Sequence, residues 1–201
     1  MNEHEPIWLA KAIQGDQEAF TSLVQTYQTP VYNLCYRMLG DPYEAEDAAQ
    51  ETFLRAYQNL KRYDTQRAFS TWLLSIAAHY CIDQIRKRRM KLLSLDDEPL
   101  LLDPPDHAPG PEPSLSLSED QKRVQQLLAQ INPQDRAAVV MLYWYDMSYD
   151  EIAVSLSLTV SAVKSRLHRA RQILAQGWSD QESKAFLKER TRNERANASA
   201  F

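Results

Sequence analysis

Glycine is scarce in this chain: only Gly15, Gly40, Gly110 and Gly177 occur among its 201 residues. Glycines this far apart cannot form G-x-G-x-x-G or G-x-x-x-x-G-K-[ST], so the commonest phosphate-binding loops of nucleotide enzymes are excluded. Each of the four is expected to end a segment or to lie in a linker. The scarcity therefore argues against a nucleotide-binding enzyme.

Cysteine is equally rare, and Cys35 and Cys81 lie within apolar helical patterns without C-x-x-C spacing. We expect two buried thiols in a reducing compartment. The chain also lacks H-E-x-x-H and G-x-S-x-G, and none of its histidines follows a glutamate by three residues, the spacing of carboxylate metal sites in helical bundles. The sequence therefore predicts a protein that is not an enzyme and that has no metal site and no cofactor.

Long apolar runs are missing as well. The longest, Ala137–Tyr145, is far too short to span a bilayer. The acidic start of the chain, MNEHEPIW, has no apolar run of the kind that signal peptides contain. These features predict a cytoplasmic protein without membrane insertion.

The net charge of −4 is unevenly distributed. Acidic residues crowd into 41–51 and 96–119, and basic residues into 86–91 and 164–171. Separated charge of this kind suits a protein that touches DNA with some surfaces and a protein partner with others.

Apolar residues recur at helical spacing through most of the chain, which predicts an all-α fold. Asp16 is expected to cap the first long helix and Pro30 to begin the next one. The predicted organisation is an N-terminal helical bundle domain (1–90), a flexible Pro-rich acidic linker (91–117), a C-terminal helix-turn-helix domain (118–177) and a polar tail (178–201) that is either a short helix or frayed. The linker holds six prolines and no sustained period.

The segment Tyr149–Leu174 predicts a helix-turn-helix. Thr159 can cap its second helix after a short turn. That helix is expected to enter the DNA major groove and to expose Ser161, Lys164, Ser165, Arg166, His168 and Arg169. The alternative is a solvated basic helix in some other helical domain.

Two further patterns each leave alternatives open. The acidic stripe of Glu44, Asp47 and Glu51 is either a solvated helix face or a docking surface for a basic partner. The segment 63–89 combines aromatic residues with a terminal basic run. Aromatic faces can stack unpaired bases while arginines follow phosphates, although aromatics at such spacing are more typical of a core.

Three motifs, DAAQETFLRAY (47–57), FSTWLLSIAAHYCIDQIRKRR (69–89) and YDEIAVSLSLTVSAVKSRLHRAR (149–171), resemble bacterial RNA polymerase sigma factors of the extracytoplasmic-function (ECF) group of the sigma-70 family. The likeness extends from about residue 20 to 174, apart from the linker. It implies that 1–90 is sigma region 2 and that 118–177 is sigma region 4.

The resemblance implies three contacts. The residues implied in binding the clamp helices of the largest polymerase subunit are Asp47, Gln50, Glu51 and Phe53. Those implied in recognising and melting the minus-10 element are Tyr63, Phe69, Trp72, Ile76, His79, Asp83, Arg86, Arg88 and Arg89. Those implied in reading the minus-35 element are Ser161, Lys164, Ser165, Arg166, His168 and Arg169.

Further partners implied by the family are promoter DNA, the flap of the second-largest polymerase subunit and an anti-sigma factor. The chain departs from the family at His79, where an Asn is frequent, and at Ser157, where a common turn glycine would adopt a positive φ. The alternative function is an ordinary helix-turn-helix regulator whose N-terminal domain senses a ligand or dimerises.

Overall fold

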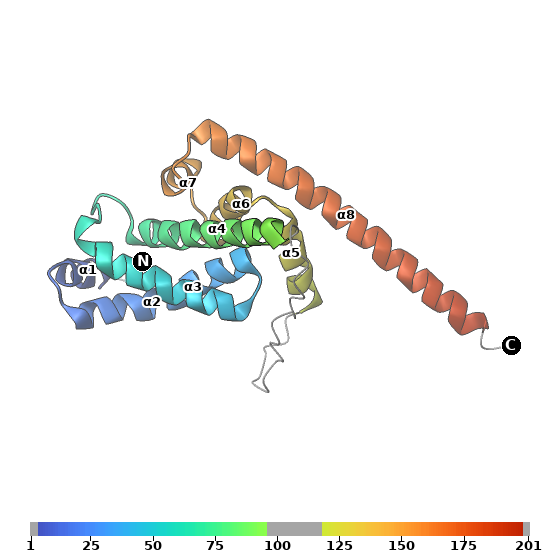
Figure 1. Cartoon of the computed structure of the whole chain (residues 1–201), viewed down its shortest axis with the longest axis horizontal. Helices are drawn as coiled ribbons and strands as arrows, with labels where there is room; N and C mark the ends of the chain where they lie inside the picture. Colours follow the sequence, from blue (N-terminus) through green and yellow to red (C-terminus); the bar gives the residue numbers. More distant parts are fainter. Residues whose placement is uncertain (1–3, 96–117, 199–201) are drawn as a thin grey trace.

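The structure is a computed structural model that describes residues 4–95 and 118–198. Within these ranges all regular secondary structure is helical, which confirms the all-α prediction (Figure 1). The elements are α1 (Glu5–Ile13), α2 (Gln17–Leu39), α3 (Pro42–Asn59), the 3₁₀ turn η1 (Leu60–Arg62), α4 (Phe69–Leu95), α5 (Glu119–Gln130), α6 (Pro133–Tyr145), α7 (Tyr149–Ser155) and α8 (Val160–Ala198). The first residues of the predicted linker continue α4, and residues 96–117 lie outside the described residues.

Short polar side chains begin several of these helices. Asp16, Asp41 and Ser148 each accept a hydrogen bond from the backbone N–H three residues later, and Asn132 accepts one from the N–H two residues later. These bonds satisfy N–H groups that have no partner within the helix. At the end of α2, Gly40 adopts a left-handed φ of 84°, which glycine accepts without strain.

The prediction that Pro30 begins a new helix is wrong, because α2 runs unbroken through it. Leu23 and Leu34, on either side of Pro30 and on the same side of the helix, are both fully buried. In addition, the hydroxyl of Tyr145 donates a hydrogen bond to the Pro30 carbonyl at 2.5 Å. Tertiary packing thus holds a continuous helix despite the N–H that proline lacks.

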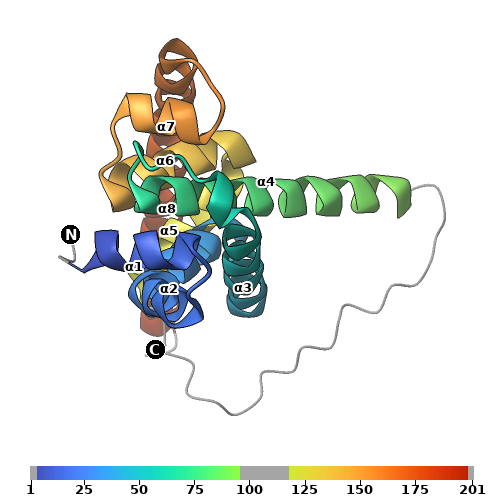
Figure 2. The same cartoon turned by 90° about the vertical axis from the view of Figure 1, so that its left-hand side faces the viewer.

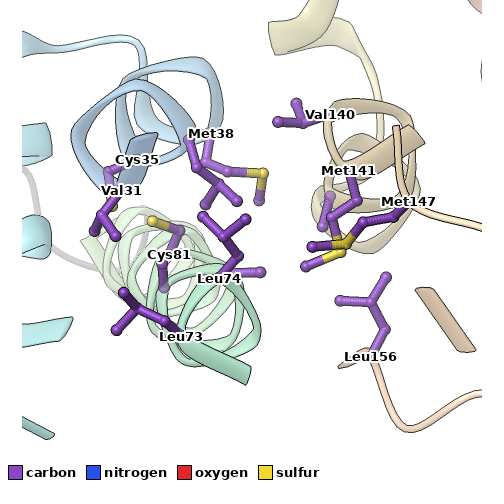
Figure 3. Packing of buried hydrophobic residues seen from close by; sticks show 14 of the residues in the cluster. Val31, Cys35, Met38, Leu73, Leu74, Cys81, Val140, Met141, Met147 and Leu156 are labelled. Carbon is purple, nitrogen blue, oxygen red and sulfur yellow. The ribbon is translucent and has the colours of Figure 1, made fainter. Parts of the chain in front are cut away.

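In the first domain, α2, α3 and α4 pack against one another. Small residues of α3, including Ala45 and Ala48, are fully buried and allow close helix approach. Cys35 of α2 and Cys81 of α4 are buried free thiols, as the sequence predicted. They lie near each other in the core (Figure 3). A hydrogen bond with Cys35, together with burial, raises the pKa of Cys81 far above its usual range.

The two domains are packed together through a shared apolar core. In Figure 3, Met38 of α2 and Leu74 of α4 lie across from Met141 of α6, with Met147 and Leu156 beyond it. Each of these five side chains is at most 6% exposed. Burial of this apolar surface supplies the main attraction between the domains.

Polar contacts at the C-terminal end of α2 add to that core. The side-chain amide of Gln125 in α5 donates to the carbonyls of Tyr36, at 3.0 Å, and Arg37, at 3.3 Å. The guanidinium of Arg136 in α6 donates to the Met38 carbonyl. The last carbonyls of a helix have no partner within it, so the second domain caps a helix of the first.

The expectation that every glycine ends a segment fails at Gly177, which lies inside the long helix α8. A Cβ at this position would stand 2.7 Å from Leu127 Cδ2 and 3.1 Å from Gln130 Oε1 of α5. The glycine therefore permits close approach of α5 to α8. The helix continues through the predicted polar tail and extends away from the rest of the molecule (Figure 1).

Candidate nucleic-acid and protein interfaces

The four predicted polymerase-binding residues all lie on α3. Asp47 and Gln50 are exposed, and Glu51 is half-buried with its carboxylate 2.7 Å from Arg55 Nε. Leu54 lies one further turn along the outer face of α3 and is 52% exposed. Sequence analysis missed Leu54, although the spacing 47, 50, 51, 54 was a signal that could have found it.

A groove of about 500 Å³ lies between α2 and α3, beside that face. Its lining includes Tyr32 and Val24 from α2 and Gln50 and Phe53 from α3. Phe53 is half-buried and packs on the core. The four predicted residues thus fall on two adjoining surfaces: Gln50 and Phe53 at the groove, and the two carboxylates on the outer face.

One stripe along α4 unites five of the predicted minus-10 residues. They recur at alternating spacings of four and three, which puts them on one side of a helix: Trp72, Ile76, His79, Asp83 and Arg86. The first two are half-buried and the last three are exposed. The stripe therefore offers an apolar, aromatic end and a polar, cationic end. Figure 2 shows α4 projecting beyond the rest of its domain.

Tyr63 and Phe69 are buried at the apolar end of this stripe, at 7% and 2% exposure. Their rings are 5.7 Å apart, and the Phe69 ring is 5.4 Å from that of Tyr27. Trp72 joins them, with its ring 5.0 Å from that of Tyr63. Edge-to-face contacts of this kind are typical of a core, so Tyr63 and Phe69 support the surface from beneath and have little area open to a base.

The basic run at the end of α4 divides between faces. Arg88 forms an ion pair with Glu44 of α3. Arg89 follows Arg86 by three residues, where the alternating spacing of the stripe requires four, so it lies to one side of the stripe. Of the three predicted arginines, Arg86 alone belongs to the α4 stripe.

The second domain contains the predicted helix-turn-helix, formed by α7 and α8. Ser157 in the turn adopts a φ of 55°, as expected at this position where a glycine is common. The hydroxyl of Thr159 accepts a hydrogen bond from the Ala162 N–H at 3.2 Å and caps α8, which confirms its predicted role.

Helix α8 presents a polar stripe to solvent. Its exposed members recur at helical spacing: Ser161, Lys164, Ser165 and His168. Arg169 lies beside them, with its side chain 55% exposed. Arg166 departs from the rest, because its side chain is 22% exposed and its Nη1 lies 2.6 Å from the Asp135 carboxylate of α6.

The acidic stripe on α3 showed no sign of metal-binding geometry. Within residues 4–91 and 118–179, where side chains are described, no group of three or more histidine, cysteine or acidic side chains is arranged to hold a metal ion. None of the helices in the described part of the chain is both long and apolar enough to cross a bilayer.

Each of the two domains matches a known protein family. The Sigma-70 region 2 family matches residues 23–90, and the Sigma-70 region 4 family matches residues 121–174. The ECF RNA polymerase sigma factor SigW of Bacillus subtilis (strain 168) is 39% identical over 167 residues, covering 80% of this chain and 89% of SigW.

Two further comparisons agree. The RNA polymerase sigma-H factor of Pseudomonas aeruginosa is 32% identical, covering 80% of this chain and 86% of that protein. The solved structure of CnrH in complex with the cytosolic domain of CnrY is 26% identical and superposes with a TM-score of 0.65, covering 89% of this chain and 99% of CnrH. An ordinary helix-turn-helix regulator would not match sigma region 2, and the chain therefore belongs to the extracytoplasmic-function group of the sigma-70 family.

Proposed function

We propose that this chain is the specificity subunit that directs RNA polymerase to a set of promoters. The observation that carries the proposal is the presence of two separate exposed stripes of DNA-binding character, one on α4 and one on α8, in the two domains that match sigma regions 2 and 4. The chain needs no catalytic residues for this role, because RNA synthesis belongs to the polymerase. The role places it in the cytoplasm, where the polymerase works.

Polymerase binding is proposed for α3. Asp47 and Gln50 are exposed and can meet the clamp helices of the largest subunit, and Leu54 adds apolar area to the same face. A charged rim around an apolar contact is the usual arrangement of a transient protein interface. Glu51, which is already paired with Arg55, contributes to the acidic field. The flap of the second-largest subunit is a second proposed contact, made by the second domain.

Recognition and melting of the minus-10 element is proposed for the α4 stripe. Trp72 and Ile76 offer apolar surface against which an unstacked base can rest, while Arg86 can follow the phosphates. Tyr63 and Phe69 hold Trp72 in place from within the core. His79, at the centre of the stripe, is exposed, and its Nδ1 donates to the Ser75 carbonyl at 2.8 Å, so the Nε2 of the neutral ring is left to accept a hydrogen bond from a base.

Recognition of the minus-35 element is proposed for α8. A helix-turn-helix places the N-terminal part of its second helix against base edges in the major groove. Lys164 and Arg169 can donate to guanine or to phosphate, and Ser161, Ser165 and His168 can donate or accept. An anti-sigma factor is also proposed as a partner, since the similar structure of CnrH was solved in complex with the cytosolic domain of CnrY.

The test is transcription in vitro with purified core polymerase, the full-length chain and a library of genomic fragments from its source organism, with start sites mapped by sequencing. We expect a discrete set of start sites that depends on adding the chain, with shared sequence at two spaced elements. Core polymerase alone is the control. An absence of new start sites, together with autonomous binding of the dimeric chain to duplex DNA, would establish the regulator alternative instead.

A further inference from the structure

Asp135 of α6 is a carboxylate in an unusual position, because it is buried at 5% exposure although it lies beside the proposed DNA-reading helix. It occupies the first turn of α6, after Asn132, whose side chain caps the helix, and Pro133 at the first helical position. A negative charge near a helix N-terminus is favoured by the helix dipole. The sequence N-P-x-D thus puts the carboxylate in the first turn of α6, a position that its own helix favours independently of any contact with α8.

Two guanidinium groups of α8 meet this carboxylate. Arg166 Nη1 lies 2.6 Å from Asp135 Oδ1, and Arg169 Nε lies 3.5 Å from Oδ2. The two arginines are three residues apart on the same side of α8. Each oxygen of the Asp135 carboxylate therefore forms an ion pair with a different arginine.

The two arginines differ in what they leave open to solvent. The side chain of Arg166 is 22% exposed and that of Arg169 is 55% exposed. Ser161, Lys164 and His168 lie on the exposed stripe of α8, and Arg166 is turned from that stripe towards α6. To reach a base, Arg166 would have to give up its 2.6 Å contact and leave a carboxylate that is 5% exposed to the longer contact with Arg169 alone. Losing a partner of a buried charge is more costly than breaking an ion pair at the surface.

We propose that Asp135 is a positioning residue for minus-35 recognition: it withdraws Arg166 from the DNA and fixes the direction in which Arg169 approaches it. This inference rests on the proposed function of α8. It assigns different parts to two arginines that belong to one basic segment. Arg166 anchors the reading helix to α6, and Arg169 contacts DNA with the part of its side chain that Asp135 leaves exposed.

Charge balance makes the proposal measurable. Asp135, Arg166 and Arg169 together carry one net positive charge, so this cluster should count as about one phosphate contact in the salt dependence of binding. Each phosphate contact contributes about 0.9 to the slope of log affinity against log salt concentration on duplex DNA. Replacing the Asp135 carboxylate by an amide removes the negative charge that offsets one of the two arginines. The slope should then steepen by about 0.9.

The experiment uses holoenzyme reconstituted from core polymerase and the full-length chain. The probe is the strongest promoter from the start-site mapping with its minus-35 element randomised, and enrichment of each base is measured by sequencing the bound fragments at several salt concentrations. The variants are Arg166→Gln, Arg169→Gln and Asp135→Asn. Asp150→Asn is the matched control, because Asp150 is an exposed carboxylate in the first turn of α7.

We expect Arg166→Gln and Asp150→Asn to leave base preferences within about twofold of the wild type. Arg169→Gln should change the preference at one position at least about fivefold, since a lost base contact has about this effect or more, or should flatten the salt slope by about 0.9 if it meets phosphate. Asp135→Asn should alter the base preferences and steepen the slope. Should Asp135→Asn impair folding, the contrast between the two arginine variants still decides the matter.

A change of preference in Arg166→Gln as large as that in Arg169→Gln would overturn the proposal, as would a uniform loss of binding in Asp135→Asn with unchanged preferences. In either case a selective wild-type holoenzyme would leave the proposed function standing. A wild-type holoenzyme without any minus-35 preference would overturn both.

Discussion

The guanidinium of Arg136 in the second domain donates a hydrogen bond to the backbone carbonyl of Met38 in the first. A second nitrogen of the same group donates to the carbonyl of Ala129 at 2.9 Å. Arg136 is 5% exposed, and burial lowers its pKa to about 10. It therefore remains charged at neutral pH. Its two Nη atoms donate to carbonyls of different domains, Met38 in the first and Ala129 in the second.

Replacement of this arginine should destabilise the whole chain. Arg136→Ala removes the donors and leaves buried carbonyls without a partner, which costs about 1–3 kcal/mol for each group left unsatisfied. Urea unfolding followed by circular dichroism measures the loss. Arg86→Ala is the control, because Arg86 is exposed, and its free energy of unfolding should stay within about 0.5 kcal/mol of the wild type. Equal stability of the two variants would contradict the role given to Arg136.

Gly177 should tolerate no large side chain. Gly177→Leu would place atoms where Leu127 and Gln130 of α5 already lie, and overpacking of this kind costs about 1–3 kcal/mol. Ala175→Leu is the matched control, since Ala175 is exposed two residues earlier on the same helix. Thermal unfolding should show a lower midpoint for Gly177→Leu alone. A midpoint equal to that of the control would mean that α5 and α8 are not closely packed here.

The cap of α7 should make stability depend on pH in the acid range. The backbone N–H and hydroxyl of Ser148 both donate to the Glu151 carboxylate, at 2.8 and 2.7 Å, and hold the pKa of Glu151 below its ordinary value of 4.5. Because the folded pKa is the lower one, this stabilisation is complete above pH 4.5 and is lost as the pH falls through the folded pKa.

Glu151→Gln keeps an acceptor at the cap but cannot titrate. We expect wild type to be the more stable of the two at pH 7, by up to about 1 kcal/mol. The difference should shrink towards pH 3, in urea unfolding measured at each pH. A difference that is constant between pH 7 and pH 3 would show that Glu151 is not bound in this way.

Charge reversal on α3 should weaken polymerase binding without unfolding the chain. Asp47 is exposed, so Asp47→Lys leaves no buried group unpaired, while it turns an attractive charge into a repulsive one at the proposed clamp interface. We expect the affinity for core polymerase, measured by fluorescence anisotropy, to fall at least about tenfold. Glu18→Lys makes the same change of charge on an exposed position of α2 and should bind within about twofold of wild type. Equal binding by both variants would count against the α3 assignment.

The α4 stripe predicts that two neighbouring arginines behave differently. Arg86 lies on the stripe, whereas Arg89 falls outside its alternating four-and-three spacing. Arg86→Ala should flatten the salt dependence of open-complex formation by about 0.7, the contribution of one contact to single-stranded DNA. Arg89→Ala should leave it unchanged. Permanganate footprinting of the melted region at several salt concentrations measures both, and a reversed order would remove Arg86 from the proposed site.

Local patterns in the sequence were enough for the helical class, the two domains and most helix starts. The predicted caps Asp16 and Thr159 satisfy N–H groups within the first turn of their own helices, so the relevant physics spans only three residues. The positive φ at Ser157, observed at 55°, was expected from the family resemblance, in which a turn glycine is common at this position. The families matched by the two domains agree with this reading of the chain.

Where local preference and packing compete, the sequence pattern alone misled. Pro30 disfavours a continuous helix by its lost N–H, yet burial of Leu23 and Leu34 holds α2 together. Gly177 favours a helix end, yet close approach of α5 keeps it inside α8. Both errors share one cause, because the deciding contacts come from segments distant in the chain.

The candidate site divides in the same way. The family resemblance named Trp72, His79 and Arg86, and their helical spacing is enough to put them on one face. Other contacts join separate segments of the chain. The ring of Tyr63 lies 5.0 Å from that of Trp72 in α4, and Nη1 of Arg166 lies 2.6 Å from the carboxylate of Asp135 in α6. The sequence by itself thus determined which residues share a helix face, since a fixed rotation per residue decides that. Only the tertiary structure decided which of them are free to meet DNA, because burial and ion pairing depend on what the rest of the chain brings alongside.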